Sequence, residues 1–466
     1  MNDTVSHYTA AERRLLSTGY RGLFIASMFV ICCTNFADRA VFAVLAQPIK
    51  VDLKLTDFEI GLVQGLGFAI LYSMVGIPFG RWSERRNRIG IVAIATTIWS
   101  VATMACGVAQ NFWHLLIARI GVGSGEAGFV PATNSLVGDQ FPARRRASTM
   151  ALIMLGTPVG TFFGSLIAGW AAAEYTWRTA FYVLGVPGLM AALFIWFVLK
   201  EPPRGLVDNT PRSAAPPPNL RAFLRKFIRP GAFRNVIIGG ALAGFGMTSI
   251  SNFLGIFLIR VHHLGVREAG ALYGTISGAS IAIGLIIGAF TSDWLAQHDK
   301  RWSAWIATLG LTVAPFVYFV AFHIEDHVPA YIVLTAAAAA LLLFYGPTLG
   351  MIQNLLEPKM RATGAALFTS LYTLIGSGLG PPFVGLTSDL FTQQAFGQGS
   401  FKAACPGGVA PPGSATDLVT ACTNASATGL QNAMTAAVCV FFVAAFFYYL
   451  ASRTLRADVY VAPPAQ

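Results

Sequence analysis

Charge is scarce in this sequence. Only 11% of its 466 residues are charged, whereas 55% are hydrophobic, and soluble domains carry roughly a quarter charged residues. So little charge, spread over the whole chain, excludes a set of soluble domains with separate cores. The class that remains is a membrane protein.

The motifs that mark common enzymes are also missing. The sequence contains no HExxH, no GxSxG and no Cys/His cluster with metal-ligand spacing. His323 and His327 come closest to a ligand pair, but they stand in a short loop between two apolar segments. We therefore expect a protein that is not an enzyme and that uses no cofactor and no metal. A membrane sensor would normally append a signalling domain, and none is recognisable.

Cysteine is sparse as well, with six residues in the chain. Four of them fall inside apolar segments, where they read as packing residues. Cys405 and Cys422 lie together in the polar segment 391–430. If this segment faces an oxidising compartment, the two can form a disulfide; the sequence leaves open whether they do.

Long apolar segments are what the sequence has in abundance. Each is long enough to cross ~30 Å of hydrocarbon as a helix. They predict an all-α polytopic membrane protein with twelve transmembrane helices. The predicted spans are 22–47, 58–80, 89–109, 111–136, 147–172, 178–199, 232–259, 267–292, 302–322, 329–356, 362–390 and 431–452.

The distribution of Lys and Arg predicts the orientation in the membrane. With the N-terminus placed in the cytoplasm, 24 of the 32 lie on the cytoplasmic side, six on the opposite side and two within spans. This bias predicts that both termini are cytoplasmic. It also accounts for the net charge of +11 without a nucleic-acid partner. Residues 1–21 are polar and predict no cleavable signal peptide, so we expect a multi-pass protein of the cell (inner) membrane.

The longest break between spans, at 200–231, divides the chain into two halves. Within it, residues 219–230 place apolar side chains on one face and basic ones on the other, as a helix lying on the membrane surface does; a solvated linker is the alternative. The predicted organisation is a tail at 1–21, a six-helix bundle at 22–199, the central loop at 200–231, a second bundle at 232–453 with the external loop 391–430, and a tail at 454–466.

The two halves resemble each other in their fifth spans. Gly156, Gly160 and Gly164 recur along the fifth span, and Gly376 to Gly385 form a Gly/Pro-rich run in the eleventh. Small residues allow helices to approach closely. A repeated six-helix unit is typical of secondary transporters, which bind substrate between the halves. For the glycines taken individually, generic membrane-helix packing is the better explanation.

Four ionisable residues stand deep within predicted spans: Asp38, Arg39, Arg119 and Glu126. Each costs at least ~2.5 kcal/mol at a helix centre, so such residues usually pair and usually function. Helix geometry places Asp38 and Arg119 at about the same depth, with Glu126 ~10 Å further along almost the same face as Arg119. We predict that Asp38, Glu126 and Arg119 couple proton binding to conformation. A static ion pair is the alternative.

The remaining candidates concern substrate binding. Arg39 and Arg119 are expected to bind an anionic head group, although Arg39 could instead reach another helix. The second half offers polar and aromatic groups, of which Asn252, Tyr345 and Thr348 are the predicted binding residues; hydrogen bonding between helices is the alternative. Such a cavity suits an amphipathic or organic anionic substrate. We expect a monomer surrounded by membrane lipids.

The loop after the second span carries the first family signature. The sequence Gly80-Arg-Trp-Ser-Glu84-Arg85-Arg86-Asn87-Arg88 resembles that of the major facilitator superfamily, although Glu84 stands where Asp is usual and Asn87 where Gly is usual. Trp177-Arg178 and Glu201-Pro202-Pro203-Arg204-Gly205 resemble further motifs of that family. The resemblance implies the major facilitator fold, with two pseudo-symmetric six-helix bundles and alternating access. It also implies a cytoplasmic latch, to which we assign Glu84, Arg85, Arg88 and Asp389.

Three segments narrow the resemblance: Asn35 to Arg39, Arg119 to Ala127, and Asp139-Gln-Phe-Pro142. Together they resemble the Spinster family, which implies a proton-linked or lipid-efflux carrier of lysolipids or sphingoid phosphates. The Asp-Arg and Gly-x-Glu-Ala motifs also resemble the anion:cation symporters of organic acids. Those usually have a Trp before the Phe-Pro, where this sequence has Asp139-Gln140. The predicted function is therefore proton-coupled transport of an amphipathic anion, with symport of small organic anions such as sugar acids as the alternative.

Overall fold

The computed structural model describes residues 9–207, 223, 225, 227–229, 231–357, 360–397 and 399–460. Every regular element among them is helical. Ten helices, some of them broken by a kink, are long and apolar enough to cross a membrane. The helical stretches α6–α7 and α17–α18 complete the twelve predicted spans. The fold is thus an all-α membrane fold, as the apolar segments predict.

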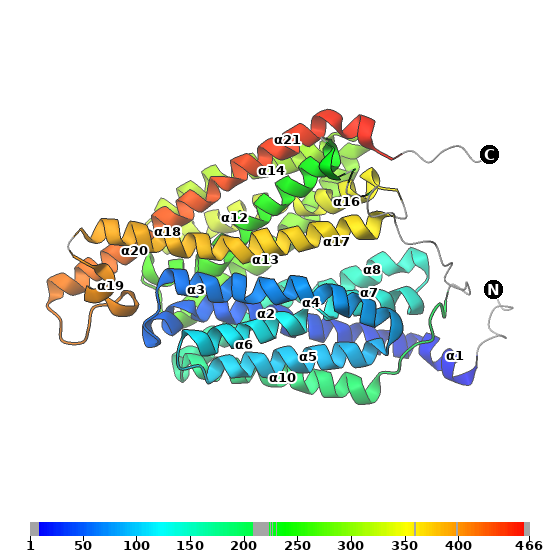
Figure 1. Cartoon of the computed structure of the whole chain (residues 1–466), viewed down its shortest axis with the longest axis horizontal. Coiled ribbons are helices and arrows are strands. Elements are labelled where there is room, and N and C mark those ends of the chain that lie inside the picture. Colours follow the sequence, from blue (N-terminus) through cyan, green and yellow to red (C-terminus); the bar gives the residue numbers. More distant parts are fainter. Residues whose placement is uncertain are drawn as a thin grey trace. The chain divides into compact units, whose positions relative to one another are not determined.

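The described residues form two compact units, each with its own packing (Figure 1). Unit 1 comprises residues 1–41 and 70–215, and unit 2 comprises residues 42–69 and 216–466. The second part of α2 and the beginning of the next span therefore pack with the C-terminal half of the chain. The two units therefore do not divide at 200–231 alone, because residues 42–69 belong to unit 2.

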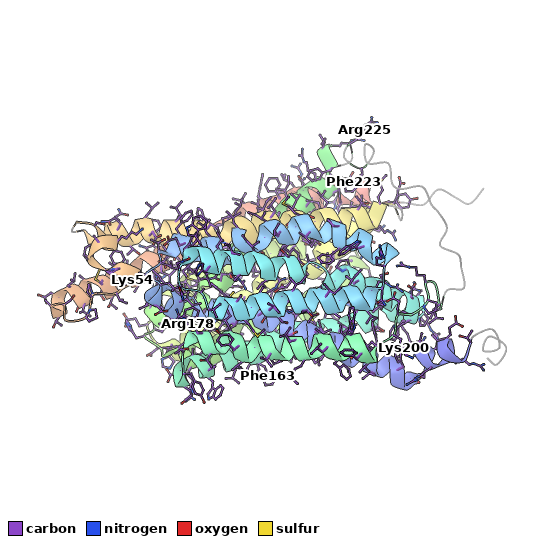
Figure 2. The ribbon with its side chains drawn as sticks, turned by 60° about the horizontal axis from the view of Figure 1, so that its bottom comes forward. Lys54, Phe163, Arg178, Lys200, Phe223 and Arg225 are labelled. Atoms are coloured by element: carbon purple, nitrogen blue, oxygen red, sulfur yellow. A yellow bond between two sulfur atoms is a disulfide. The ribbon has the colours of Figure 1, made fainter. Side chains whose placement is uncertain are left out.

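The helices of unit 1 are α1 (Ala10–Leu16), the first part of α2 (Thr18–Asp52), most of α4 (Leu66–Arg85), α5 (Arg88–Gly107), α6 (Phe112–Glu126), α7 (Phe129–Gln140), α8 (Ala143–Met154), α9 (Gly156–Glu174) and α10 (Trp177–Val198). In Figure 1, α5 runs beside α6 and α10, against which it packs. Arg178 and Lys200 mark the two ends of α10 (Figure 2).

Small residues bring α9 against α2, as the glycine spacing predicts. A Cβ at Gly160 would lie 2.2 Å from the carbonyl oxygen of Cys33, and one at Gly164 would lie 2.5 Å from Cα of Ala37. No side chain fits in these positions, so the two backbones touch directly. This contact fixes the part of α2 that leads to Asp38.

The helices of unit 2 are the end of α2, α3 (Asp57–Gln64), the start of α4, α12 (Ala232–Arg260), α13 (Val266–Ala296), α14 (Trp302–His323), α15 (His327–Leu342), α16 (Tyr345–Leu355), α17 (Arg361–Leu371), the π-helix η2 (Tyr372–Leu379), α18 (Gly380–Phe396), α19 (Phe401–Ala404), η3 (Pro406–Gly408), α20 (Thr416–Val438) and α21 (Val440–Asp458). The predicted loop 391–430 is thus largely helical, because α18 continues to Phe396 and α20 already begins at Thr416.

Close backbone contact recurs between α3 and α18. A Cβ at Gly61 would lie 2.4 Å from the carbonyl oxygen of Pro381, and one at Gly385 would lie 2.2 Å from that of Asp57. The π-helix η2 directly precedes α18, and π-helical turns often mark functional sites. This seam places the start of α3 against the middle of α18.

The predicted surface helix at 219–230 lies largely outside the described residues. Of its side chains, Phe223 is buried and its ring packs against Phe233, as does the ring of Phe227. Arg225 is exposed (Figure 2). The membrane-surface location of this segment stays a prediction.

Candidate functional site

Unit 1 holds the four charged residues of the predicted site, which we call the charged cluster: Asp38, Arg39, Arg119 and Glu126. Asp38 and Arg39 lie on α2, and the other two lie on α6. Helix α6 ends at Glu126, and α7 begins only at Phe129. Gly125 packs against the backbone of α5, where a Cβ would lie 2.6 Å from the amide nitrogen of Trp99. The glycine run therefore seats Glu126 at a break in the membrane helix, and such breaks are tolerated where they face protein or a cavity.

Glu126 pairs with Arg39. The Arg39 Nε donates to Glu126 Oε2 at 2.8 Å, and Nη2 lies 2.6 Å from the same oxygen. The guanidinium also lies over the rings of Phe36 and Tyr72, at 5.3 and 5.6 Å from their centroids. Of the two alternatives for Arg39, the structure therefore has it reaching another helix, in contact with Glu126.

Asp38 is buried and lies in a different environment. Its Oδ2 accepts a hydrogen bond from Thr103 Oγ1 on α5 at 3.0 Å, while Oδ1 has no hydrogen-bond partner among the described residues. Arg119 is also buried and lies close enough for its charge to act on both Asp38 and Glu126. The structure thus brings all four predicted residues together, with Thr103 and Tyr72 as additional members.

The predicted binding residues of the second half lie in unit 2 and differ in their exposure. Tyr345 is half-buried in an aromatic group, with ring centroids 5.9 Å from Tyr372 and 6.4 Å from Phe368. Asn252 donates to the carbonyl oxygen of Thr248 in its own helix at 2.8 Å. Thr348 is fully buried, and its hydroxyl bonds to the carbonyl of Phe344 and to the hydroxyl of Tyr448. These bonds favour a packing role for Thr348 over contact with a substrate.

A second charged group in unit 2 was missed by sequence reasoning, and we call it the Asp57 hub. Asp57 is only 1% exposed. Its Oδ1 accepts from Lys50 Nζ at 2.7 Å and Arg260 Nη2 at 2.6 Å, and its Oδ2 accepts from Arg260 Nη1 and Ser388 Oγ, both at 2.8 Å. Arg260 Nε also donates to Gln47 Oε1 at 2.7 Å. The hub ties the end of α2 and the start of α3 to the end of α12 and to α18.

Asp389 belongs beside this hub, which corrects its assignment to the latch with Glu84. Its two carboxylate oxygens accept from the backbone N–H groups of Asp57 and Phe58, at 3.0 and 2.9 Å. These groups begin α3, whereas Glu84 and Arg85 end α4, at the other end of the same span. The physical reason is the direction in which the two spans cross the membrane. The second span runs toward Glu84, and the eleventh runs the opposite way toward Asp389, so the two acids lie on opposite sides.

Of the other predicted latch residues, Glu84, Arg85 and Arg88, the structure describes the side chain of Arg88 alone. The side chains of Glu84 and Arg85 lie outside the described residues. Arg88 is fully buried at the first position of α5. Its Nε donates to Glu201 Oε1 at 2.6 Å, its Nη1 pairs with the carboxylate of Asp139, and its Nη2 donates to the carbonyl of Pro202 at 2.9 Å. Arg88 therefore joins the start of α5 to the end of α7 and to the segment after α10.

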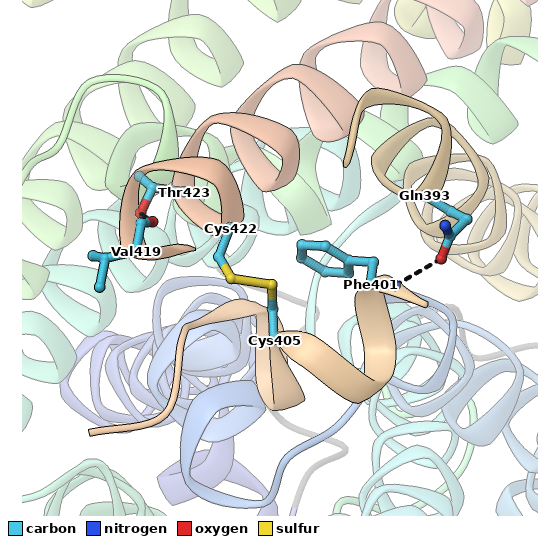
Figure 3. Close-up of a disulfide and its surroundings, with 6 residues drawn as sticks. All are labelled: Gln393, Phe401, Cys405, Val419, Cys422 and Thr423. Carbon is cyan, nitrogen blue, oxygen red and sulfur yellow. Dashed lines mark hydrogen bonds between the residues drawn. A yellow bond between two sulfur atoms is a disulfide. The ribbon is translucent and has the colours of Figure 1, made fainter. Parts of the chain in front are cut away.

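Cys405 and Cys422 form a disulfide in the structure (Figure 3). It joins the end of α19 to α20. Nearby, the Phe401 N–H donates to Gln393 Oε1 at 2.8 Å (Figure 3). No three His, Cys, Asp or Glu side chains among the residues that the structure places are arranged to hold a metal ion.

Comparisons with known proteins place this multi-pass helical fold in a family. A model of the Major Facilitator Superfamily matches residues 28–381. The chain belongs to this superfamily. An MFS-type efflux pump of Mycolicibacterium smegmatis is 33% identical to this major facilitator protein over 77% of this chain and 82% of its own. The human protein spinster homolog 1 is 27% identical over 80% of this chain and 74% of its own.

A solved structure gives the closer assignment. The crystal structure of a bacterial homolog to the human lysosomal transporter Spinster, in an inward-facing and unoccupied conformation, superposes with a TM-score of 0.87 at 31% identity. The match covers 96% of this major facilitator protein and all of that chain. A hexuronate transporter of Bacillus subtilis is 28% identical over only 59% of this chain and 65% of its own. This major facilitator protein is therefore a Spinster-like transporter, not an enzyme.

Proposed function

We propose that this major facilitator protein is a proton-coupled secondary transporter that moves an amphipathic anion by alternating access. The observation that carries the proposal is the pairing of Arg39 with Glu126. Arg39 keeps 35% of its side-chain surface exposed, whereas the side chain of Glu126 is fully buried. A dissolved anion can therefore approach Arg39 but not Glu126.

A proton on Glu126 changes what Arg39 binds. While Glu126 is ionised, it neutralises Arg39 and competes with any anionic head group. When Glu126 takes up a proton, the guanidinium loses the negative charge beside it and can bind the anionic head group instead. Protonation and anion binding then favour each other. Asp38, buried nearby, is the second proposed proton acceptor, and Arg119 acts electrostatically on both carboxyl groups.

The proposed substrate has an apolar tail as well as an anionic head. Within unit 2, Tyr345 lies in an aromatic group with Tyr372 and Phe368, and Asn252 lies on α12 of the same unit; both stay proposed binding residues. The resemblance to the Spinster family implies lysolipids or sphingoid phosphates as the substrate class. The partial similarity to a hexuronate transporter supports a small sugar acid as the second candidate.

Transport by the purified protein in proteoliposomes, with and without a pH gradient, tests the proposal. A lysolipid or sphingoid phosphate series of increasing chain length should gain about fourfold in affinity per methylene until the cavity is filled, because each buried CH₂ contributes about 0.8 kcal/mol. A sugar acid site would show no such slope. It would instead reject analogues that lack a hydroxyl group. Flux that ignores the pH gradient would refute proton coupling.

A further inference from the structure

A cavity of about 360 Å³ lies in unit 1, away from the charged cluster. It forms where α4 ends, α5 begins and α10 ends. Its lining is mostly apolar and contains no acidic side chain among the residues described. The lining residues are Trp82, Arg86, Asn87, Ile89, Gly90, Ile91, Ile94, Trp196 and Leu199.

Two tryptophans on different helices form its walls. Trp82 is 58% exposed and Trp196 is 52% exposed. Trp82 is oriented by the ring of Phe79, whose centroid lies 5.9 Å away. Trp is typical of the membrane–water interface, where its ring lies at the level of the lipid head groups. The walls are therefore suited to a chain that enters from the bilayer.

A glycine keeps the floor of the cavity open. A Cβ at Gly90 would meet the ring of Trp196 and the amide of Asn87, both at 3.5 Å, which is ordinary contact distance. A small side chain would fit there without moving the backbone, but a larger one would fill the cavity.

The mouth of the cavity carries positive charge. Arg86 is exposed and lines it. Arg204, also exposed, donates from Nη2 to the carbonyl oxygen of Arg86 at 3.2 Å and so brings a second guanidinium to this point. Among the residues described, the carboxylates at the adjoining start of α5, Glu201 and Asp139, are both bonded to Arg88. This loop is also one of the Lys/Arg-rich loops that the charge distribution predicts to be cytoplasmic, where the leaflet is anionic.

We propose that this cavity binds an anionic phospholipid of the surrounding bilayer. The phosphate lies against Arg86, and one acyl chain lies between Trp82 and Trp196 along Ile94. Charge complementarity selects an anionic head group, and the two aromatic walls require an acyl chain, which a free phosphate lacks. The inference does not depend on the proposed transport function.

Native mass spectrometry of the full chain in mild detergent tests this site, with phosphatidylglycerol, phosphatidylcholine and inorganic phosphate as the three probes. We expect the wild-type protein to retain one phosphatidylglycerol in preference to phosphatidylcholine. Arg86→Ala should weaken this retention about tenfold, as loss of one charge-assisted hydrogen bond does. Gly90→Leu should abolish it by filling the cavity. Arg145→Ala, at an exposed position on α8, removes the same charge elsewhere and should leave retention unchanged.

The remaining outcomes each overturn the proposal. Equal retention of phosphatidylcholine would show that the head group is not selected. Displacement of phosphatidylglycerol by inorganic phosphate alone would indicate an anion site without a chain. Wild-type retention in Gly90→Leu, with the variant eluting as the folded protein does, would place the bound lipid outside the cavity.

Discussion

At the scale of single residues, the sequence identifies the four members of the charged cluster, but it does not identify the pairing of Arg39 with Glu126. Charged residues within apolar spans are conspicuous, so all four could be predicted. The partner of Glu126 could not, because helix phase places Arg39 about 100° from Asp38 and takes no account of the reach of a long arginine side chain. Thr103 and Tyr72 gave no signal, since such residues are common in membrane helices.

The pairing of Arg39 with Glu126 makes a specific prediction. Glu126→Gln mimics the protonated carboxyl group, so the negative charge that neutralises Arg39 should be absent at every pH. Substrate affinity of the wild-type protein should rise as the pH falls through the range in which Glu126 takes up its proton. In Glu126→Gln, the affinity should be high and independent of this range. Binding measured by calorimetry across a pH series checks this.

Asp38→Asn provides the companion measurement. It should abolish transport driven by a proton gradient while leaving substrate exchange intact. If both carboxyl groups belong to one network, the double variant should depart from additivity by about 0.5–3 kcal/mol in binding free energy. Strict additivity, or an unchanged pH profile in Glu126→Gln, would assign the two carboxyl groups to separate roles.

At the scale of elements, the sequence predicted the helices better than the segment between the last two spans. A long apolar segment indicates a membrane span, but residues 391–430 are polar, so the sequence did not predict helix α19 or the start of α20. The disulfide between Cys405 and Cys422 cross-links this segment. Close after Cys405, Gly407 and Gly408 have φ values of 72° and 87°, which favour glycine. Lys50 lies close to this turn, because a Cβ at Gly408 would lie 3.2 Å from Lys50 Nζ.

The disulfide should therefore hold η3 over Lys50 and the Asp57 hub. The disulfide joins residues separated by 17 positions, and a cross-link that closes a loop of this size stabilises a folded protein by about 3 kcal/mol. Cys405→Ser removes this cross-link. Hydrogen exchange should rise in residues 402–410 and also in 47–56 at the end of α2. Cys439→Ser, at an exposed free cysteine, is the control and should change neither segment. Unchanged exchange at 47–56 would show that η3 does not stabilise the hub.

At the scale of the whole molecule, a carrier must open each side of the membrane in turn, and we propose that the Asp57 hub holds one side closed. It joins residues 42–69, from the N-terminal half of the sequence, to α12 and α18 from the C-terminal half. Sequence reasoning missed it because Asp57 reads as an ordinary acid in the first turn of a helix. Lys50 and Arg260 gave the available signal: both are basic residues on the side where Lys and Arg are rare.

Opening this side requires the hub to separate, and Asp57→Asn should favour that step. The substitution keeps the shape of the side chain but leaves Lys50 and Arg260 as two neighbouring buried cations. A penalty of about 3 kcal/mol, the low end for breaking a buried ion pair, changes the ratio of two conformations by about 100-fold. Spin labels at Lys54→Cys and Gly265→Cys, in a Cys439→Ser background, should report a longer distance distribution. Asp417→Asn, at an exposed acid of unit 2, should leave the distances unchanged. Adding Arg260→Gln to Asp57→Asn removes one of the two unbalanced positive charges and should restore the short distances. If the double variant keeps the long distances, the shape of the hub, and not its charge, holds it closed.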